Sequence, residues 1–188
     1  MNRKLQISAR TAVSALGRGV ACHADALVEA RSGLIACDFP AVDLETWIGR
    51  VSGLEDEPLT GALSDFDCRN NRLGMAALKQ DGFIEAVAEA RARYGASRIG
   101  VFMGTSTSGV LQTEEAYAQA NPESGALPDD YIYRTTQNIY SIASFTREAL
   151  QLEGPALVVS TACSSSAKVF ATAWRHMQAG LCDAAVVG

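Results

Sequence analysis

The amino-acid sequence predicts an α/β protein built around a central sheet. Short apolar runs rich in β-branched residues, which have the length of buried strands, alternate with longer segments in which apolar residues recur at helical spacing. No internal repeat or low-complexity tract interrupts this alternation. With 188 residues, 48% of them hydrophobic and 20% charged, the chain has the size and composition of one globular domain with a substantial core.

The expected strands and helices follow one another along the whole chain. Strands are expected at residues 5–7, 47–51, 97–103, 155–159 and 182–187. Helices are expected at residues 21–30, 68–78, 84–94, 110–120 and 137–152, and from residue 163 towards Gly180. Asp65 or Asp67 is suited to cap the helix at 68–78. Residues 13–19 are expected to form a loop, and residues 37–63 an excursion from the main layer.

The composition argues against several classes of function. A formal net charge of −5 disfavours non-specific nucleic-acid binding, which needs a strongly basic face. The charged start at residues 1–4 is not followed by the apolar segment of a signal peptide, and no apolar run is long enough to span a membrane. The cysteines at positions 22, 37, 68, 163 and 182 form no C-x-x-C pair, which is typical of reduced thiols. We expect a cytoplasmic protein with no metal or other cofactor and with neither nucleic acid nor membrane as a partner.

The most distinctive stretch runs from Val158 to Ala167 and contains Cys163. This cysteine follows an expected strand and precedes about fifteen residues with neither glycine nor proline, so it should lie where a strand turns sharply into a helix. Its small neighbours, Ala162 and three serines, suit such a turn. At a helix start, unpaired N–H groups and the helix dipole favour a thiolate, and the same N–H groups can hold an oxyanion. The residues alone leave two interpretations open, a nucleophile or a cysteine that merely packs.

Two further features bear on chemistry. Residues 104–109 form a polar loop after the expected strand at 97–103, where open α/β sheets bind ligands, but its glycine spacing matches neither a phosphate-binding loop nor a dinucleotide fingerprint. The two histidines are His23 and His176. His176 lies thirteen residues beyond Cys163 on the same expected helix, about 20 Å away, and is too distant to be its base. We expect His23 to be structural.

With these residues assembled, the chain resembles the N-terminal half of a β-ketoacyl-acyl-carrier-protein synthase of the thiolase superfamily. The resemblance covers nearly the whole chain. It is carried by S-G at 32–33, I-G-V-F-M-G-T at 99–105, G-P at 154–155, S-T-A-C-S-S at 160–165, and A-G at 179–180 with D-A-A-V-V-G at 183–188. It implies a thiolase-like fold, to which residues 1–188 contribute one N-terminal domain: a mixed five-stranded sheet with helices on both faces, half of a layered αβαβα structure.

The resemblance also implies a reaction. An acyl group passes from an acyl carrier protein to the thiol of Cys163, malonyl carrier protein loses carbon dioxide, and the carbanion attacks the thioester to give a 3-oxoacyl product. By the same resemblance, Cys163 also supplies one N–H that binds the oxyanion. Ala162 and Thr107 are implied to lie at the substrate, with Thr107 as a gate beside the acyl pocket. Arg69 and Arg72 are implied to lie on the face that docks the carrier protein. The resemblance implies a homodimer, in fatty acid synthesis or in an aryl-polyene or other specialised pathway.

Alternatives to these assignments stay open. A biosynthetic thiolase acting on coenzyme A esters has a related fold, and so does a non-catalytic chain-length partner of a synthase, although such partners typically lack the cysteine. Arg69 and Arg72 fit an ordinary solvated face equally well. The family draws two histidines and a lysine from a second half, and neither His23 nor His176 matches them. We therefore expect the native chain to continue past Gly188, and residues 1–188 alone to be unable to catalyse condensation.

Overall fold

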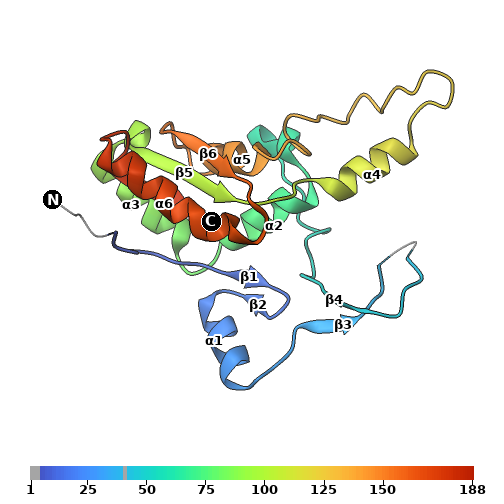
Figure 1. Ribbon diagram of the computed structural model, residues 1–188, viewed down its shortest axis with the longest axis horizontal. Coiled ribbons are helices and arrows are strands. Elements are labelled where there is room, and N and C mark those ends of the chain that lie inside the picture. The colour runs from blue at the N-terminus through green and yellow to red at the C-terminus, as the bar shows by residue number, and fades with distance from the viewer. Residues whose placement is uncertain (1–4, 40–41) are drawn as a thin grey trace.

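The computed structural model describes residues 5–39 and 42–188. The charged residues at 1–4, and residues 40–41 of the expected excursion, lie outside the described residues. Strands and helices alternate as expected of an α/β protein (Figure 1). The strands are β1 (Val13–Ser14), β2 (Gly17–Arg18), β3 (Leu34–Ala36), β4 (Trp47–Gly49), β5 (Ile99–Gly104), β6 (Ala156–Val159) and β7 (Ala184–Val187). The α-helices are α1 (Val20–Val28), α2 (Arg69–Leu78), α3 (Phe83–Tyr94), α4 (Val110–Ala118), α5 (Ser141–Ala149) and α6 (Ser165–Gln178), and the 3₁₀ helices are η1 (Gly61–Phe66), η2 (Ala96–Arg98) and η3 (Ala162–Ser164).

The central sheet consists of three parallel strands in the order β6-β5-β7. β5 lies in the middle, and its first four residues are buried. Its sequence is apolar without alternation, as expected of a strand that is covered on both faces. The register pairs Gly104 of β5 with Val159 of β6, and Phe102 of β5 with Val187 of β7. Because the strands are parallel, the carboxyl ends of β5 and β6 lie at the same edge of the sheet.

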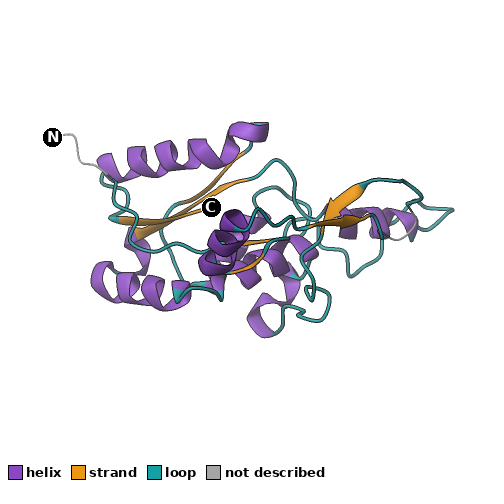
Figure 2. Ribbon diagram, turned by 90° about the horizontal axis from the view of Figure 1, so that it is seen from below, coloured by secondary structure: helices purple, strands orange, loops and turns teal. Residues whose placement is uncertain are grey.

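Helices cover both faces of this sheet, so that part of the prediction is confirmed (Figure 2). α6 packs across all three strands on one face, whereas α3 and α5 pack on the other. Beneath α6 lies a small buried cluster of Phe102, Val169, Ala173 and Cys182. A larger buried cluster, which includes Ile99, Val101, Phe145 and Val186, fills the other side. The sheet with its two helical layers forms the core of the described chain.

The five-stranded sheet implied by the resemblance is not found among the described residues, and this prediction was wrong. The described strands form one sheet of three strands and two separate sheets of two. The segment expected as a strand at 47–51 contributes β4, which pairs antiparallel with β3 rather than joining the central sheet. Trp47 is 67% exposed and Leu34 is 55% exposed. Apolar residues in this part of the chain therefore do not mark strands of the core.

The start of the chain also differs from expectation. The strand expected at 5–7 is absent, and Ile7 is 69% exposed, so the apolar residues there form no buried strand. The segment at 13–19, expected as a loop, contains the β1–β2 hairpin, in which Val13 pairs with Arg18. Only two residues connect these strands, which is the shortest common hairpin connection. Gly17 has a positive φ of 140°, which a glycine adopts without steric cost.

The expected helices are present with shifted ends. α5 begins at Ser141 rather than at residue 137, because a turn precedes it in which the side chain of Asn138 accepts a hydrogen bond from the N–H of Tyr140 (2.9 Å). The cap predicted for α2 was wrong, since Cys68 occupies the N-cap position and makes no side-chain cap bond. The carboxylate of Asp67 instead accepts the N–H of Leu59 (3.0 Å).

α6 is buried on one face only, although its apolar sequence predicts burial on nearly every side. Val169 and Ala173 are buried against the sheet, whereas Phe170 is 44% exposed. A single sheet covers a single face of a helix, and the face of α6 that carries Phe170 is open in the described chain. Neither α6 nor any other helix of the described residues is long and apolar enough to cross a membrane.

Candidate active site

Cys163 lies at the junction between the edge strand β6 and the helix α6. β6 ends at Val159, and the short helix η3 (Ala162–Ser164) carries the cysteine immediately before α6 begins at Ser165. The residue is exposed. This is the strand-to-helix junction that the sequence predicts. A thiol in this position is accessible to a substrate and lies at the amino end of a fourteen-residue helix.

The backbone of this junction is turned sharply. Ala162 has a positive φ of 50°, in the left-handed region that residues other than glycine seldom adopt. Two backbone hydrogen bonds close the turn, from the N–H of Ser164 to the carbonyl of Thr161 (3.3 Å) and from the N–H of Ser165 to the carbonyl of Ala162. Neither bond uses the N–H of Cys163. An oxyanion role for this N–H is therefore compatible with the geometry.

The polar loop at 104–109 meets the same edge of the sheet as Cys163. The N–H of Thr105 donates to the carbonyl of Val159 at the end of β6 (3.2 Å). Thr107, the expected gate, is exposed, and its carbonyl accepts a hydrogen bond from the hydroxyl of Thr105. The buried hydroxyl of Ser108 donates to the carbonyl of Thr136 (2.8 Å). The structure thus brings the loop of Thr107 and the turn of Ala162 and Cys163 to one edge of the sheet. The bond from Ser108 also anchors the loop of Thr107 to the segment that contains Thr136.

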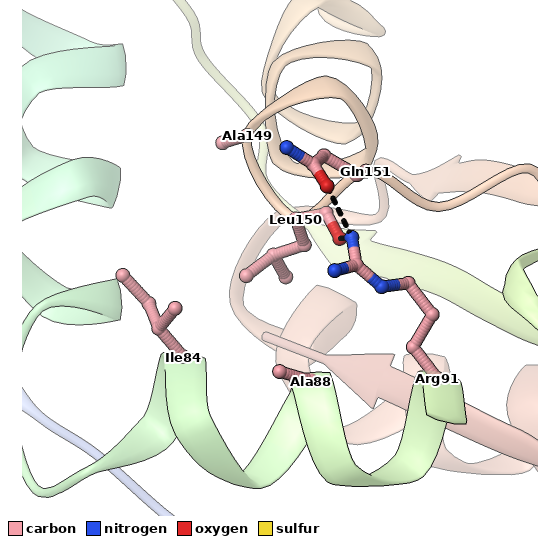
Figure 3. Close-up of a pocket in the computed structure, with 6 residues that line it drawn as sticks. All are labelled: Ile84, Ala88, Arg91, Ala149, Leu150 and Gln151. Carbon is pink, nitrogen blue, oxygen red and sulfur yellow. Dashed lines mark hydrogen bonds between the residues drawn. The ribbon is translucent and has the colours of Figure 1, made fainter. Parts of the chain in front are cut away.

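The two cavities described for this chain do not include Cys163 among their lining residues. One, of about 310 Å³, lies beside residues 7–10 and Asp81. The other, of about 130 Å³, lies between α3 and the end of α5 (Figure 3). There the guanidinium of Arg91 donates to the carbonyl of Leu150 (3.2 Å) and to the side-chain oxygen of Gln151 (2.6 Å). Arg91 of α3 thus ties this helix to the end of α5.

Both histidines make local contacts, as the sequence predicts for His23. The ring of His176 lies against Phe102, with centroids 4.8 Å apart, and its Nδ1 donates to the carbonyl of Thr172 (2.9 Å). His23 hydrogen-bonds the hydroxyl of Ser14 (2.8 Å) and the carbonyl of Gly19 (2.7 Å). Across residues 5–39 and 42–188, no cluster of three His, Cys, Asp or Glu side chains is arranged to hold a metal ion. The described residues therefore place no histidine base beside Cys163.

The other cysteines differ from Cys163 in their surroundings. Cys68 and Cys182 are buried, and burial raises the pKa of each thiol, which keeps it protonated. Cys22 and Cys37 are half-buried. Cys163 is thus the cysteine with the most accessible thiol among the five.

The two arginines expected to dock a carrier protein already have partners within the chain. Arg69 forms an ion pair with Glu55 (2.8 Å) and donates to the carbonyl of Val51 (3.1 Å). Arg72 holds both carboxylate oxygens of Asp67 at 2.6 Å. Burial raises the pKa of Asp67, but the hydrogen bonds from Arg72 and from the N–H of Leu59 outweigh it, so the pKa is lowered overall. Both guanidinium groups stabilise the segment that precedes α2, and carrier docking by them stays a prediction.

Arg72→Ala is expected to lower the free energy of unfolding by about 1–3 kcal/mol at pH 7, because it leaves the half-buried carboxylate of Asp67 without its cation. Since the folded-state pKa of Asp67 is depressed, its stabilisation is fully present above the unfolded pKa of about 3.9 and is lost as the pH falls through the lower folded value. Urea unfolding at pH 7 and pH 3 should therefore show a deficit that shrinks in acid. Arg69→Ala, whose partner Glu55 is 60% exposed, is the control and should cost less than about 1 kcal/mol. A deficit of the same size at both pH values would contradict this role for Arg72.

The fold and the position of Cys163 together define a class of protein. It is an α/β protein in which an exposed cysteine stands between a parallel strand and the helix that packs on the sheet, an arrangement suited to nucleophilic chemistry on thioesters. Residues 50–188 match the family model of the β-ketoacyl synthase N-terminal domain. The chain belongs to the β-ketoacyl synthase family, and the resemblance seen in the sequence is confirmed.

Two solved structures share the fold. A ketosynthase, ApeO, in complex with its chain length factor, ApeC, from Xenorhabdus doucetiae is matched with a TM-score of 0.73 and 32% identity, over 96% of this chain and 46% of that one. AntDE:AntF, a type II PKS acyl-carrier protein in complex with its ketosynthase bound to the hexaketide, is matched with a TM-score of 0.67 over 94% of this chain and 47% of that one. At 13% identity the second match shows the fold alone. Both support a thiolase-like fold.

Two curated relatives are large polyketide enzymes. The polyketide synthase ThaG of Burkholderia thailandensis is 35% identical over 105 residues, which are 56% of this chain and 2% of that protein. The hybrid PKS-NRPS synthetase TAS1 of Pyricularia oryzae is 29% identical over 155 residues, which are 74% of this chain and 8% of that protein. The chain therefore spans a small part of these relatives and less than half of the matched chain in each of the two solved complexes.

Proposed function

We propose that this chain carries the nucleophile of a ketosynthase that condenses an acyl thioester with malonyl carrier protein. The observation that supports this most is the exposed Cys163 at the β6–α6 junction of a chain in the β-ketoacyl synthase family. The polyketide relatives and the similarity to a ketosynthase complex favour polyketide or polyene synthesis, with fatty acid synthesis as a related possibility. The family, the fold and the exposed cysteine all support a condensing enzyme of this family.

The proposed reaction has two bond-forming steps. In the first, the thiol of Cys163 gives up its proton and the resulting thiolate attacks the thioester carbonyl of an acyl carrier protein. The carrier sulfur leaves as a thiolate and takes up that proton. In the second, malonyl carrier protein releases carbon dioxide, its carbanion attacks the acyl group, and the thiolate of Cys163 leaves. A thiolate is suited to both steps because it is a good nucleophile and a good leaving group. In each step the developing oxyanion needs donors, of which the N–H of Cys163 is the proposed first one.

Condensation needs more than the residues described here supply. His23 and His176 are both engaged in local contacts away from Cys163, so neither is placed to donate a hydrogen bond to the thioester oxygen of the malonyl group, where negative charge develops as carbon dioxide leaves. We therefore propose that residues 1–188 alone do not condense, and that a histidine-bearing segment completes the site. The same reasoning does not affect the first step, for which an exposed nucleophile is the main requirement.

Acyl carrier protein is the proposed partner in both steps. A similar solved ketosynthase is described as bound to an acyl-carrier protein, and another as bound to its chain length factor. We propose a homodimer. The alternative, which the ApeO–ApeC complex suggests, is a pair with a chain-length-factor subunit. The five free thiols fit a reducing compartment, so the cytoplasm is the proposed location.

The reaction is tested by supplying the intact protein with acyl carrier protein and two different extenders. Malonyl carrier protein should give 3-oxoacyl carrier protein with release of carbon dioxide, and acetyl coenzyme A should give no product. Product from acetyl coenzyme A alone would indicate a thiolase. No product from either extender, together with iodoacetamide labelling of Cys68 or Cys182 but not of Cys163, would contradict a catalytic role and indicate a chain-length partner.

A further inference from the structure

Ser165 is a buried residue that bridges the turn on which Cys163 lies. It is the first residue of α6, and it is only 3% exposed although its neighbours Ser164 and Ser166 are accessible. Its hydroxyl accepts a hydrogen bond from the N–H of Thr161 (2.9 Å) and donates one to the carbonyl of Ala162 (2.7 Å). One side chain thus bonds backbone groups of the two residues that precede the cysteine.

The carbonyl of Ala162 belongs to the same peptide group as the N–H of Cys163. This carbonyl accepts two bonds from Ser165, one from its hydroxyl and one from its N–H. In a trans peptide the C=O and the N–H point in opposite directions. Because the carbonyl is held towards Ser165, the N–H of Cys163 is directed away from it. Ser165 therefore determines the direction of the proposed oxyanion donor.

The turn also needs external support, because Ala162 is held in the left-handed region with a φ of 50°. A non-glycine residue keeps this conformation only where its surroundings impose it. Movement towards the sheet is limited by β5, since a Cβ on Gly104 would lie 2.7 Å from the carbonyl carbon of Ser165. On the other side, the hydroxyl of Ser165 holds Thr161 and Ala162.

We infer that Ser165 is a positioning residue, whose buried hydroxyl fixes the Ala162–Cys163 peptide group and so aims the N–H of Cys163 at the acyl oxygen. The inference rests on the proposed function. It distinguishes Ser165 from Ser164, whose hydroxyl is more accessible and bonds only Thr161 (carbonyl, 2.9 Å; hydroxyl, 3.0 Å). Ser164 does not touch the peptide group of Cys163 through its side chain, and it provides a matched control one residue away.

The test compares Ser165→Ala and Ser164→Ala in the intact protein by two reactions of Cys163. Acyl transfer from acyl carrier protein passes through an oxyanion, whereas alkylation by iodoacetamide does not. Ser165→Ala should lower kcat for acyl transfer by about tenfold to a hundredfold, with KM within about twofold and the alkylation rate of Cys163 within about threefold of wild type. Ser164→Ala should leave both reactions close to wild type. A loss in acyl transfer without a loss in alkylation would distinguish a changed direction of the N–H of Cys163 from general damage to the turn.

Three outcomes would overturn the inference. Unchanged acyl transfer in Ser165→Ala, or equal losses in acyl transfer and alkylation, would show that Ser165 does not act through the oxyanion donor, while the proposed function stands. Absence of acyl transfer in the wild-type protein would overturn both. Should Ser165→Ala fail to fold, Ser165→Cys places a somewhat larger and more weakly hydrogen-bonding atom at the same position. The same difference between acyl transfer and alkylation is expected of this variant, with the alkylated cysteine identified by peptide fragmentation.

Discussion

Cys163→Ser is expected to reduce condensation by the intact protein at least about 10³-fold, because a hydroxyl at this position is a far weaker nucleophile and leaving group than a thiolate. The substitution changes one atom of an exposed side chain, so the fold should be unaffected. The measurement is the initial rate of 3-oxoacyl carrier protein formation, accompanied by a thermal unfolding curve to show that the variant is native.

Cys37→Ser is the matched control for this experiment. Cys37 is a half-buried free thiol that directly follows β3, outside the central sheet, and its replacement should change the rate by less than about twofold. A Cys163→Ser variant that retains even a tenth of the wild-type rate would contradict covalent catalysis at this position.

Gly154→Ala is expected to have the largest effect on folding, with a loss of about 3–5 kcal/mol in the free energy of unfolding. Gly154 lies in the turn before β6, where a Cβ would overlap the backbone carbonyl of Ile99 at the start of β5. This contact is between backbone atoms, so no flexible side chain can yield. The turn would have to move away, and with it the bond from the N–H of Val101 to the carbonyl of Pro155 (2.8 Å) that begins the pairing of β5 with β6.

The effect of Gly154→Ala is measured by urea unfolding, with Glu153→Ala as the control. The side chain of Glu153 is exposed, and the bond that its backbone N–H donates to Ala96 (3.0 Å) survives the change. The control should therefore cost less than about 0.5 kcal/mol. Equal stabilities of the two variants would show that β5 and β6 tolerate a wider spacing than the structure has.

The central part of the fold could be predicted because its sequence pattern and its environment agree. β5, β6 and β7 are short apolar runs that follow helical segments, and in the structure they are parallel strands with helices on the faces of their sheet. The first fifty residues behave differently. The exposed apolar residues there, such as Trp47 and Ile7, have the composition of core strands without their burial. Hydrophobicity indicates burial only where a second element covers the residue, and that information is not local in the sequence.

The candidate site was predictable to a similar extent. Small residues around Cys163 and a long uninterrupted helical segment after it predict the strand-to-helix turn, which the structure contains. The role of Ser165 was not visible, because nothing in a run of three serines shows which hydroxyl is buried. The ion pair of Arg72 with Asp67 was also missed, because Asp67 precedes α2 and the two residues do not have the spacing of three or four at which ion pairs on a helix are expected. His23 and His176, neither of which the sequence offers as a base for Cys163, both make local hydrogen bonds in the structure.

The central claim is that Cys163 carries the acyl group as a thioester. It is tested most directly by incubating the intact protein with an acyl carrier protein, without malonyl extender, followed by acid quenching, proteolysis and mass spectrometry of the peptides. The expected result is a mass increase equal to the acyl group on the peptide that contains Cys163, which neutral hydroxylamine removes. An unmodified Cys163 peptide under conditions in which the protein turns over its substrates, or an acyl group found on another residue, would contradict the claim.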